Sequence, residues 1–159
     1  MDLTIRDVRQ ADLPSLVEML HEFAAFENLS DYCTVTEDRL QKAMFDAGSE
    51  VEGLMAFDGE ICIAYALFYP NFSSFRGQRG IHLDDLYIKS EYRKNGLGGV
   101  MLKEIARIAA SRGLERIDFN VLEWNTLALK FYDKLGAVCN MEERHFKFAD
   151  KAFDALASN

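Results

Sequence analysis

A short basic segment with two glycines, Arg93-Lys94-Asn95-Gly96-Leu97-Gly98, constrains the fold of this chain more than any other feature. It follows a strand-like stretch at residues 81–88 and precedes residues 98–112, where apolar side chains recur at helical spacing. Glycine lets the backbone adopt left-handed angles and lets an anion approach closely. The N–H groups of a helix's first turn point outward, at the positive end of the helix dipole. The segment therefore predicts an anion site, with a pyrophosphate as the expected ligand.

Glycines at such a turn also occur in two nucleotide-binding motifs and in plain helix starts. A dinucleotide-binding fingerprint requires a third glycine three residues after the second, where this chain has Met101. A P-loop requires Gly-Lys-Ser/Thr, whereas Gly98 is followed by Gly99 and Val100. The remaining alternative is a plain helix start with flexible residues. A lone Gly-x-Gly usually has that explanation.

Length, charge and cysteine content narrow the class of protein. We expect one domain over residues 1–159, and no stretch approaches the roughly 18 to 20 apolar residues that span a membrane. The first residues enter a strand pattern and lack a leader peptide's basic and apolar regions. Cys33, Cys62 and Cys139 are far apart and odd in number, which favours the reduced thiols of a cytoplasmic protein. The net charge of −8 argues against nucleic acid as a partner and is compatible with a cationic small substrate.

Hydrophobic periodicity predicts a mixed α/β fold in the order β-α-α-β-β-β-α-β-α-β. A polar loop is expected at residues 71–80, and Asp58-Gly59 is a hairpin turn signal. Asp12 and Thr36 are expected to begin the first two helices, and Gly113 and Gly136 to end the last two. The strands are predicted at residues 3–8, 51–57, 60–69, 81–88, 116–122 and 144–149.

Two blocks of the chain resemble the GNAT N-acetyltransferases. The glycine turn fits the acetyl-CoA-binding signature Arg/Gln-x-x-Gly-x-Gly/Ala of that superfamily, between a strand and an amphipathic helix. The second block begins with Glu123-Trp124-Asn125 and ends with Phe131-Tyr132-Asp133-Lys134-Leu135-Gly136-Ala137. The resemblance implies a GNAT fold, a mixed and mostly antiparallel sheet of about seven strands flanked by about four helices. It also implies acetyl-CoA as co-substrate and no metal.

Within the superfamily, the chain is similar to the spermidine/spermine and thialysine N-acetyltransferases. Residues 83–93, 121–125 and 22–27 carry this similarity. It implies a small cationic amine as acceptor and a homodimer. The alternatives are the same fold acting on a protein N-terminus or an aminoglycoside, and a non-catalytic acyl-CoA-binding sensor.

Acetyl transfer to an amine requires a base, because an alkyl ammonium has a pKa near ~10.4, and a proton donor for the departing thiolate. The resemblance implies that Tyr132 is the donor and that Asp84 helps to deprotonate the amine through water. A phenol and a thiol have pKa values of roughly 10 and 8.5, which favours easy exchange. The cofactor contacts implied are Leu86, Tyr87, Ile88, Arg93, Lys94, Asn95, Gly96, Leu97, Gly98, Gly99, Asn125 and Ala128. The substrate contacts implied are Phe26, Glu27, Phe75, Asp84 and Glu123.

Three details refine the expected site. Asn125 and Tyr132 are seven residues apart, so both project from one side of a helix. Asp84 and Asp85 are neighbours on a strand and should face opposite sides. Asp84 is one methylene shorter than the glutamate of the polyamine group, so His82 is an alternative base. Arg144 lies in a segment shorter than its polyamine counterpart, where a cation opposes a long polyamine and favours an amino acid's carboxylate.

Overall fold

The computed structural model describes residues 2–158, which form two compact units, Met1–Asn120 and Val121–Asn159. The first unit contains a five-stranded sheet in the order β1-β2-β3-β4-β5. Its three antiparallel pairings join the first four strands, and β5 pairs with β4 in parallel. The strands are β1 (Leu3–Asp7), β2 (Glu52–Asp58), β3 (Ile61–Ser73), β4 (Gln78–Ile88) and β5 (Arg116–Phe119). The predicted mixed, mostly antiparallel α/β sheet is confirmed.

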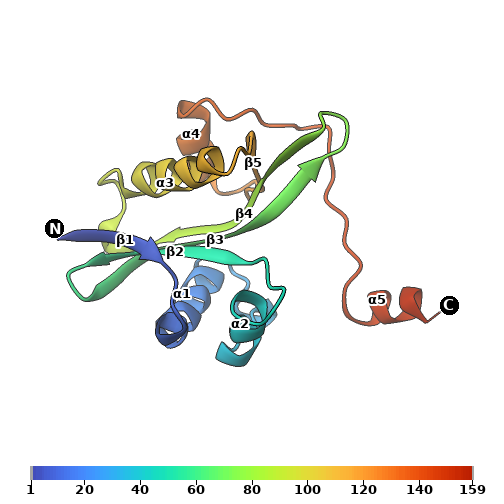
Figure 1. Ribbon diagram of the computed structural model, residues 1–159, viewed down its shortest axis with the longest axis horizontal. Coiled ribbons are helices and arrows are strands. Elements are labelled where there is room, and N and C mark those ends of the chain that lie inside the picture. The colour runs from blue at the N-terminus through green and yellow to red at the C-terminus, as the bar shows by residue number, and fades with distance from the viewer. Residues whose placement is uncertain (1, 159) are drawn as a thin grey trace. The chain divides into compact units, whose positions relative to one another are not determined.

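Helices cover both faces of this sheet (Figure 1). The helices α1 (Leu13–Phe26) and α2 (Glu37–Met44) pack on one face, where Leu16, Met19 and Tyr65 are completely or almost completely buried. The helix α3 (Leu97–Ser111) packs on the other face through its apolar stripe. That stripe consists of Leu97, Met101, Ile105 and Ala109. The four-residue spacing predicted this buried face, because side chains at i and i+4 lie on one side of a helix.

Most predicted turns and caps are present where the sequence places them. Asp12 precedes α1, but its carboxylate accepts hydrogen bonds from Arg6 and from the Arg9 N–H and does not cap that helix. Thr36 accepts a hydrogen bond from the Arg39 N–H at the start of α2. Gly59 has φ 60° in the turn between β2 and β3, and Gly113 has φ 68° after the end of α3. The expected polar loop is shorter than predicted, because β3 and β4 extend through most of residues 71–80 and pair as far as Ser73 and Gln78. Asn71 and Gly80 are therefore a paired couple within the sheet.

The second unit contains the helices α4 (Thr126–Lys134) and α5 (Asp150–Ala157). The predicted strand at residues 144–149 is wrong, and residues 2–158 hold five strands and five α-helices instead of about seven and about four. Alternating apolar residues form a strand only when a neighbouring strand accepts their backbone hydrogen bonds. The structure has no strand at residues 144–149, and the Phe146 and Phe148 side chains are 85% and 67% exposed.

Candidate active site

The glycine turn leads directly into α3. Lys94 and Gly96 have φ values of 66° and 79°, in the left-handed region, and Gly96 is the N-cap residue. The first N–H groups of the helix, at Leu97, Gly98 and Gly99, have no acceptor within the helix. A Cβ atom added at Gly96 or Gly99 would meet no protein atom within 4 Å, so protein packing does not demand glycine there. The turn therefore presents open backbone amides, which suits the diphosphate of a nucleotide-containing ligand.

The Arg93 side chain points into the protein from this turn. Its Nε donates a hydrogen bond to the Ile88 carbonyl over 2.8 Å. Its guanidinium carbon lies 4.4 Å from the centre of the Phe26 ring and 5.5 Å from that of Tyr87. Cation–π contacts of this kind favour a cation over an aromatic face. Arg93 thus links the end of α1, where the substrate residues are predicted, to the start of the glycine turn.

The strand β4 has an unpaired edge next to this turn. Its pairing with β5 ends at Leu83 opposite Phe119, whereas β4 continues to Ile88. On the other edge, Leu86, Tyr87 and Ile88 remain paired with β3. The main-chain groups on the β5 side of these residues therefore have no strand partner among residues 2–158. An extended ligand arm can hydrogen-bond to such an edge.

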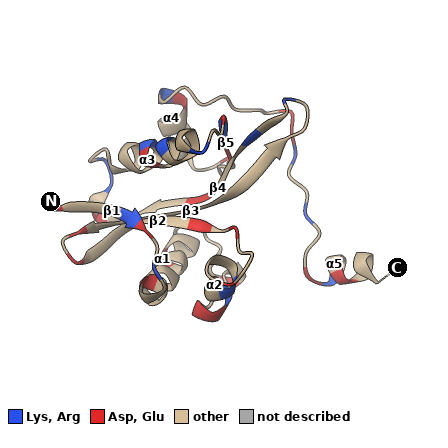
Figure 2. Cartoon of the chain, in the orientation of Figure 1, with Lys and Arg blue, Asp and Glu red and all other residues tan. Residues whose placement is uncertain are grey.

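A break in strand register places two carboxylates beside tyrosines of β3. Leu67 pairs with Asp85 and Phe68 with Leu83, so Asp84 is an extra residue in β4. Figure 2 shows where the acidic and basic residues lie along the chain. The Tyr65 hydroxyl donates a hydrogen bond to Oδ2 of Asp85 over 3.1 Å. Burial is the main cause that raises the pKa of Tyr69, and the negative charge of Asp84 raises it further. Tyr65 and Tyr69 are four residues apart on β3 and share a face. The expectation that Asp84 and Asp85 face opposite sides assumed a regular strand, and the inserted residue breaks that regular alternation.

The two carboxylates differ in exposure. Asp84 is exposed and Asp85 is half-buried. Burial, and then the charges of Asp84 and Glu27, raise the pKa of Asp85 to about 7, although the hydrogen bond from Tyr65 opposes this shift. His82, the alternative base, stacks on the Tyr69 ring at a centroid distance of 5.0 Å. Asp85 is the carboxylate whose protonation changes near neutral pH, and sequence reasoning missed it.

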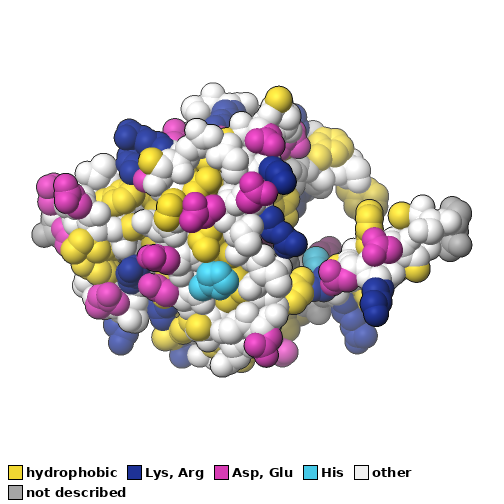
Figure 3. Space-filling view, turned by 90° about the horizontal axis from the view of Figure 1, so that it is seen from below, with side chains coloured by type: hydrophobic (Ala, Val, Ile, Leu, Met, Phe, Trp, Pro, Cys, Tyr) yellow, Lys and Arg dark blue, Asp and Glu magenta, His cyan; other side chains and the backbone are white. Residues whose placement is uncertain are grey.

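The predicted substrate residues fall into three places. Phe26 and Glu27 lie at the end of α1, and burial raises the pKa of Glu27. Phe75 is fully exposed in the turn between β3 and β4, seven residues beyond Phe68 at the register break, so this chain does not bring it to Asp84. Glu123 is exposed in the second unit. Figure 3, which views the molecule from the side of α1 and α2, shows acidic side chains spread over that face of the first unit.

The second unit holds the predicted proton donor. The Asn125 side-chain oxygen caps α4 by accepting a hydrogen bond from the Ala128 N–H over 3.2 Å. The Ala128 N–H therefore already has a hydrogen-bond partner. The Tyr132 ring lies edge-on to Phe131 at a centroid distance of 5.0 Å. Burial raises the pKa of Tyr132 to about 12. Tyr132 therefore keeps its proton at neutral pH, and its pKa lies further above that of a thiol than the sequence expectation assumed.

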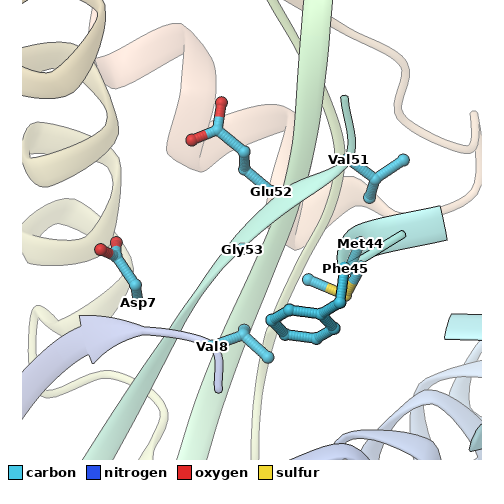
Figure 4. Close-up of a pocket in the computed structure, with 7 residues that line it drawn as sticks. All are labelled: Asp7, Val8, Met44, Phe45, Val51, Glu52 and Gly53. Carbon is cyan, nitrogen blue, oxygen red and sulfur yellow. The ribbon is translucent and has the colours of Figure 1, made fainter. Parts of the chain in front are cut away.

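A hollow of about 170 Å³ at the start of β2 is a poorer candidate (Figure 4). Glu52 there is ion-paired with Arg112 over 2.6 Å, and Val8, Met44 and Phe45 give the hollow an apolar side. A Cβ atom at Gly53 would lie 2.8 Å from a Leu67 side-chain atom, so this glycine is explained by packing alone. Gly96 and Gly99, in contrast, have open space beside their backbone where a ligand can approach.

Residues 2–158 lack the side-chain groupings of a metal centre. Their histidine, cysteine and acidic side chains form no group of three or more placed to hold a metal ion. None of their helices combines the length and apolar character needed to cross a membrane. Burial raises the pKa of the Cys62 thiol to about 11, which disfavours a thiolate nucleophile at that position.

Comparison with known proteins places this geometry in a family. Residues 16–137 match the acetyltransferase (GNAT) family. The chain is 31% identical to a thialysine N-epsilon-acetyltransferase from Bos taurus over 164 aligned residues, which cover 96% of each chain. It is 23% identical to an L-ornithine N5-acetyltransferase from Arabidopsis thaliana, over 96% of this chain and 86% of the relative.

A solved structure of an integron cassette protein from the mobile metagenome of V. cholerae has the same fold. The TM-score is 0.82 at 23% identity, over 100% of this chain and 99% of the other. The family match spans the open amides before α3, the unpaired edge of β4 and the paired carboxylates. The chain therefore belongs to the GNAT family and is an acetyl-CoA-dependent N-acetyltransferase.

Proposed function

We propose that this chain transfers the acetyl group of acetyl-CoA to a primary amine of a small basic metabolite, a diamine or a thialysine-like diamino acid. The observation that carries the proposal is a set of three carboxylates: the charges of Glu27 and Asp84 both act on Asp85, and no basic residue is among the groups that shift the pKa of Asp85. An ammonium group supplies the missing positive charge. The names of the relatives, which specify thialysine and ornithine, point to the same class of acceptor.

The charge of the chain supports a cationic acceptor. The net charge is −8, and a negative field raises the local concentration of positive ligands. Arg144 favours a diamino acid over a long polyamine, because a guanidinium attracts a carboxylate and repels a further ammonium group. Thialysine and ornithine each carry one carboxylate, whereas spermidine carries none.

The backbone on either side of the glycine turn is proposed to hold acetyl-CoA. The amides of the turn and of the first turn of α3 bind the diphosphate, and the unpaired edge of β4 binds the extended arm. Bound acetyl-CoA supplies an activated acetyl thioester. The residues proposed for these contacts are Leu86, Tyr87, Ile88, Lys94, Asn95, Gly96, Leu97, Gly98 and Gly99.

Two side chains are proposed to move protons. Asp84, the exposed carboxylate of β4, receives the ammonium group of the acceptor and helps to deprotonate it. Tyr132 gives the proton of its hydroxyl to the departing sulfur and is reprotonated from the acceptor nitrogen. Over one cycle the ammonium loses two protons, of which one reaches the sulfur and the other is released to solvent. Asn125 and Ala128 orient α4, from which Tyr132 projects.

A panel of acceptors tests the proposed substrate class. Thialysine, ornithine, spermidine, an aminoglycoside and a peptide with a free N-terminus are each supplied with acetyl-CoA, and mass spectrometry detects the acetylated product. We expect kcat/KM for thialysine or ornithine to exceed that for the peptide and the aminoglycoside by at least about 10-fold, since even a one-methylene mismatch in a substrate pocket costs about 10-fold or more. Preference for the peptide or the aminoglycoside would overturn this assignment.

We also propose that the chain forms a homodimer. Val138 and Met141 are 95% and 80% exposed, and Phe146 and Phe148 of the same segment are also largely uncovered. These side chains come from one segment, residues 138–148, and exposed apolar surface commonly marks protein contacts. Sedimentation analysis should give about twice the chain's 18.1 kDa mass, and Phe146→Ser combined with Phe148→Ser should shift it to the monomer. A wild-type monomer at micromolar concentration would contradict the proposal.

A further inference from the structure

We propose that Asp85, held by the hydroxyl of Tyr65, is the base that finally accepts the proton lost by the acceptor ammonium. The inference rests on the proposed function and assigns the base within it. Asp84 binds the ammonium at the surface, and the proton passes from there to Asp85. In this step one N–H bond breaks and one O–H bond forms on the Asp85 carboxylate. The electron pair stays on nitrogen, which becomes the nucleophile.

The register break divides the work between the two carboxylates. Because Asp84 is the extra residue of β4, it breaks the regular alternation of side chains beside Asp85, and its charge acts on both Asp85 and Tyr69. Asp84 is exposed and available to a ligand, whereas Asp85 lies deeper. A substrate ammonium therefore meets Asp84 first, and Asp85 is the adjacent site to which its proton can move.

The Tyr65 hydroxyl fixes the orientation of Asp85. Its oxygen lies 3.1 Å from Oδ2 of Asp85, and the Tyr65 side chain is completely buried. The Tyr65 ring also packs against Tyr87 at a centroid distance of 6.0 Å. Burial, followed by the charge of Asp85, raises the pKa of Tyr65 well above its usual range. Tyr65 therefore remains a donor throughout the working pH range, and Asp85 is the member of the pair that titrates.

The groups around Asp85 make it an effective base near neutral pH. Asp84 on β4 and Glu27 at the end of α1 are acidic, Tyr65 on β3 is its hydrogen-bond donor, and Cys33 acts electrostatically on Tyr65. The nearby cations Lys89 and Arg93 contact Glu22 and the Phe26 and Tyr87 rings instead. A pKa of about 7 leaves a gap of about 3.4 units to an alkyl ammonium near ~10.4, compared with about 6.5 for an ordinary aspartate near ~3.9. General bases work best when their pKa lies near the working pH.

The experiment is the pH profile of kcat/KM for thialysine at saturating acetyl-CoA. The wild-type enzyme should lose activity below about pH 7, where Asp85 becomes protonated. Asp85→Asn should lower kcat by at least about 100-fold and remove this acidic limb. Tyr65→Phe should move the limb to higher pH, because the hydroxyl hydrogen bond lowers the pKa of Asp85. Asp84→Asn should move the limb to lower pH, because the charge of Asp84 raises that pKa.

If Asp85 is the base, the acidic limb moves in opposite directions in Tyr65→Phe and Asp84→Asn, and a purely structural role for Asp85 does not predict this. An acidic limb that persists in Asp85→Asn, or that moves the same way in Tyr65→Phe and Asp84→Asn, would overturn the assignment. Wild-type inactivity with every amine would instead overturn the proposed function, and this assignment with it. If Asp85→Asn does not fold, carbon-13 NMR titration of the Asp85 carboxyl in the wild type and in Tyr65→Phe decides the question. A carboxyl that titrates below pH 5 in both would refute the proposal.

Discussion

Replacing Tyr132 with phenylalanine is expected to lower kcat by about 100- to 1,000-fold while leaving the dissociation constant of acetyl-CoA within about threefold of the wild-type value. The substitution removes only the hydroxyl. Since the pKa of Tyr132 is about 12, that hydroxyl carries its proton at every working pH and can donate it to the departing sulfur. A loss confined to kcat means that the group acts in the transition state and contributes little to binding. Stopped-flow turnover and calorimetric titration with acetyl-CoA measure the two quantities.

The neighbouring residue offers a matched control. Phe131 and Tyr132 pack edge-on with centroids 5.0 Å apart, so Phe131→Leu disturbs the same contact and retains the hydroxyl. We expect that variant to keep its turnover within about fivefold, because aromatic pairs of this kind contribute only about 0.5–1.5 kcal/mol. If both variants lose the same activity, packing on α4 explains the effect and the proton-donor role is refuted. Equal losses of turnover and acetyl-CoA affinity in Tyr132→Phe would favour a sensor that binds acyl-CoA without catalysis.

The sequence predicts those parts of the fold that depend on local chemistry. The helix α3 was predictable because its buried residues recur every four positions and because Gly113 ends it in a left-handed conformation. The hairpin at Asp58-Gly59 follows from the same kind of local preference. The open amides before α3 also depend only on neighbouring residues. The sequence therefore sufficed to predict the turn that we propose as the anion site.

The parts that were not predicted depend on residues far apart in the chain. One extra residue in β4 shifts its register with β3 at Asp84, yet the sequence of a strand with a register break resembles that of a regular one. The one signal for the Tyr65–Asp85 hydrogen bond is Tyr65 itself, because a buried tyrosine hydroxyl needs a hydrogen-bond partner. The orientation of Arg93 depends on Phe26, which belongs to another helix. The strand expected at residues 144–149 lacks a neighbouring strand, which alternation alone cannot reveal.

Replacing Gly96 with valine is expected to weaken acetyl-CoA binding by at least about 10-fold and to lower the free energy of unfolding by about 1–3 kcal/mol. Gly96 has φ 79°, a left-handed angle that a β-branched side chain adopts only with strain. Relief of that strain would rotate the amides on both sides of the turn away from the diphosphate. Calorimetric titration with coenzyme A and urea-induced unfolding measure the two effects.

Gly99→Ala provides the control for this effect, because it lies in the same turn but has helical backbone angles. A Cβ atom at Gly99 meets no protein atom within 4 Å, and alanine is favoured over glycine in a helix by about 0.5–1 kcal/mol. The amide N–H is retained, so acetyl-CoA affinity should stay within about threefold while stability increases. The two glycine substitutions therefore change stability in opposite directions, and only Gly96→Val weakens binding. Unchanged coenzyme affinity in Gly96→Val would mean that the diphosphate is bound elsewhere, because the substitution is expected to rotate the amides of the turn away from it.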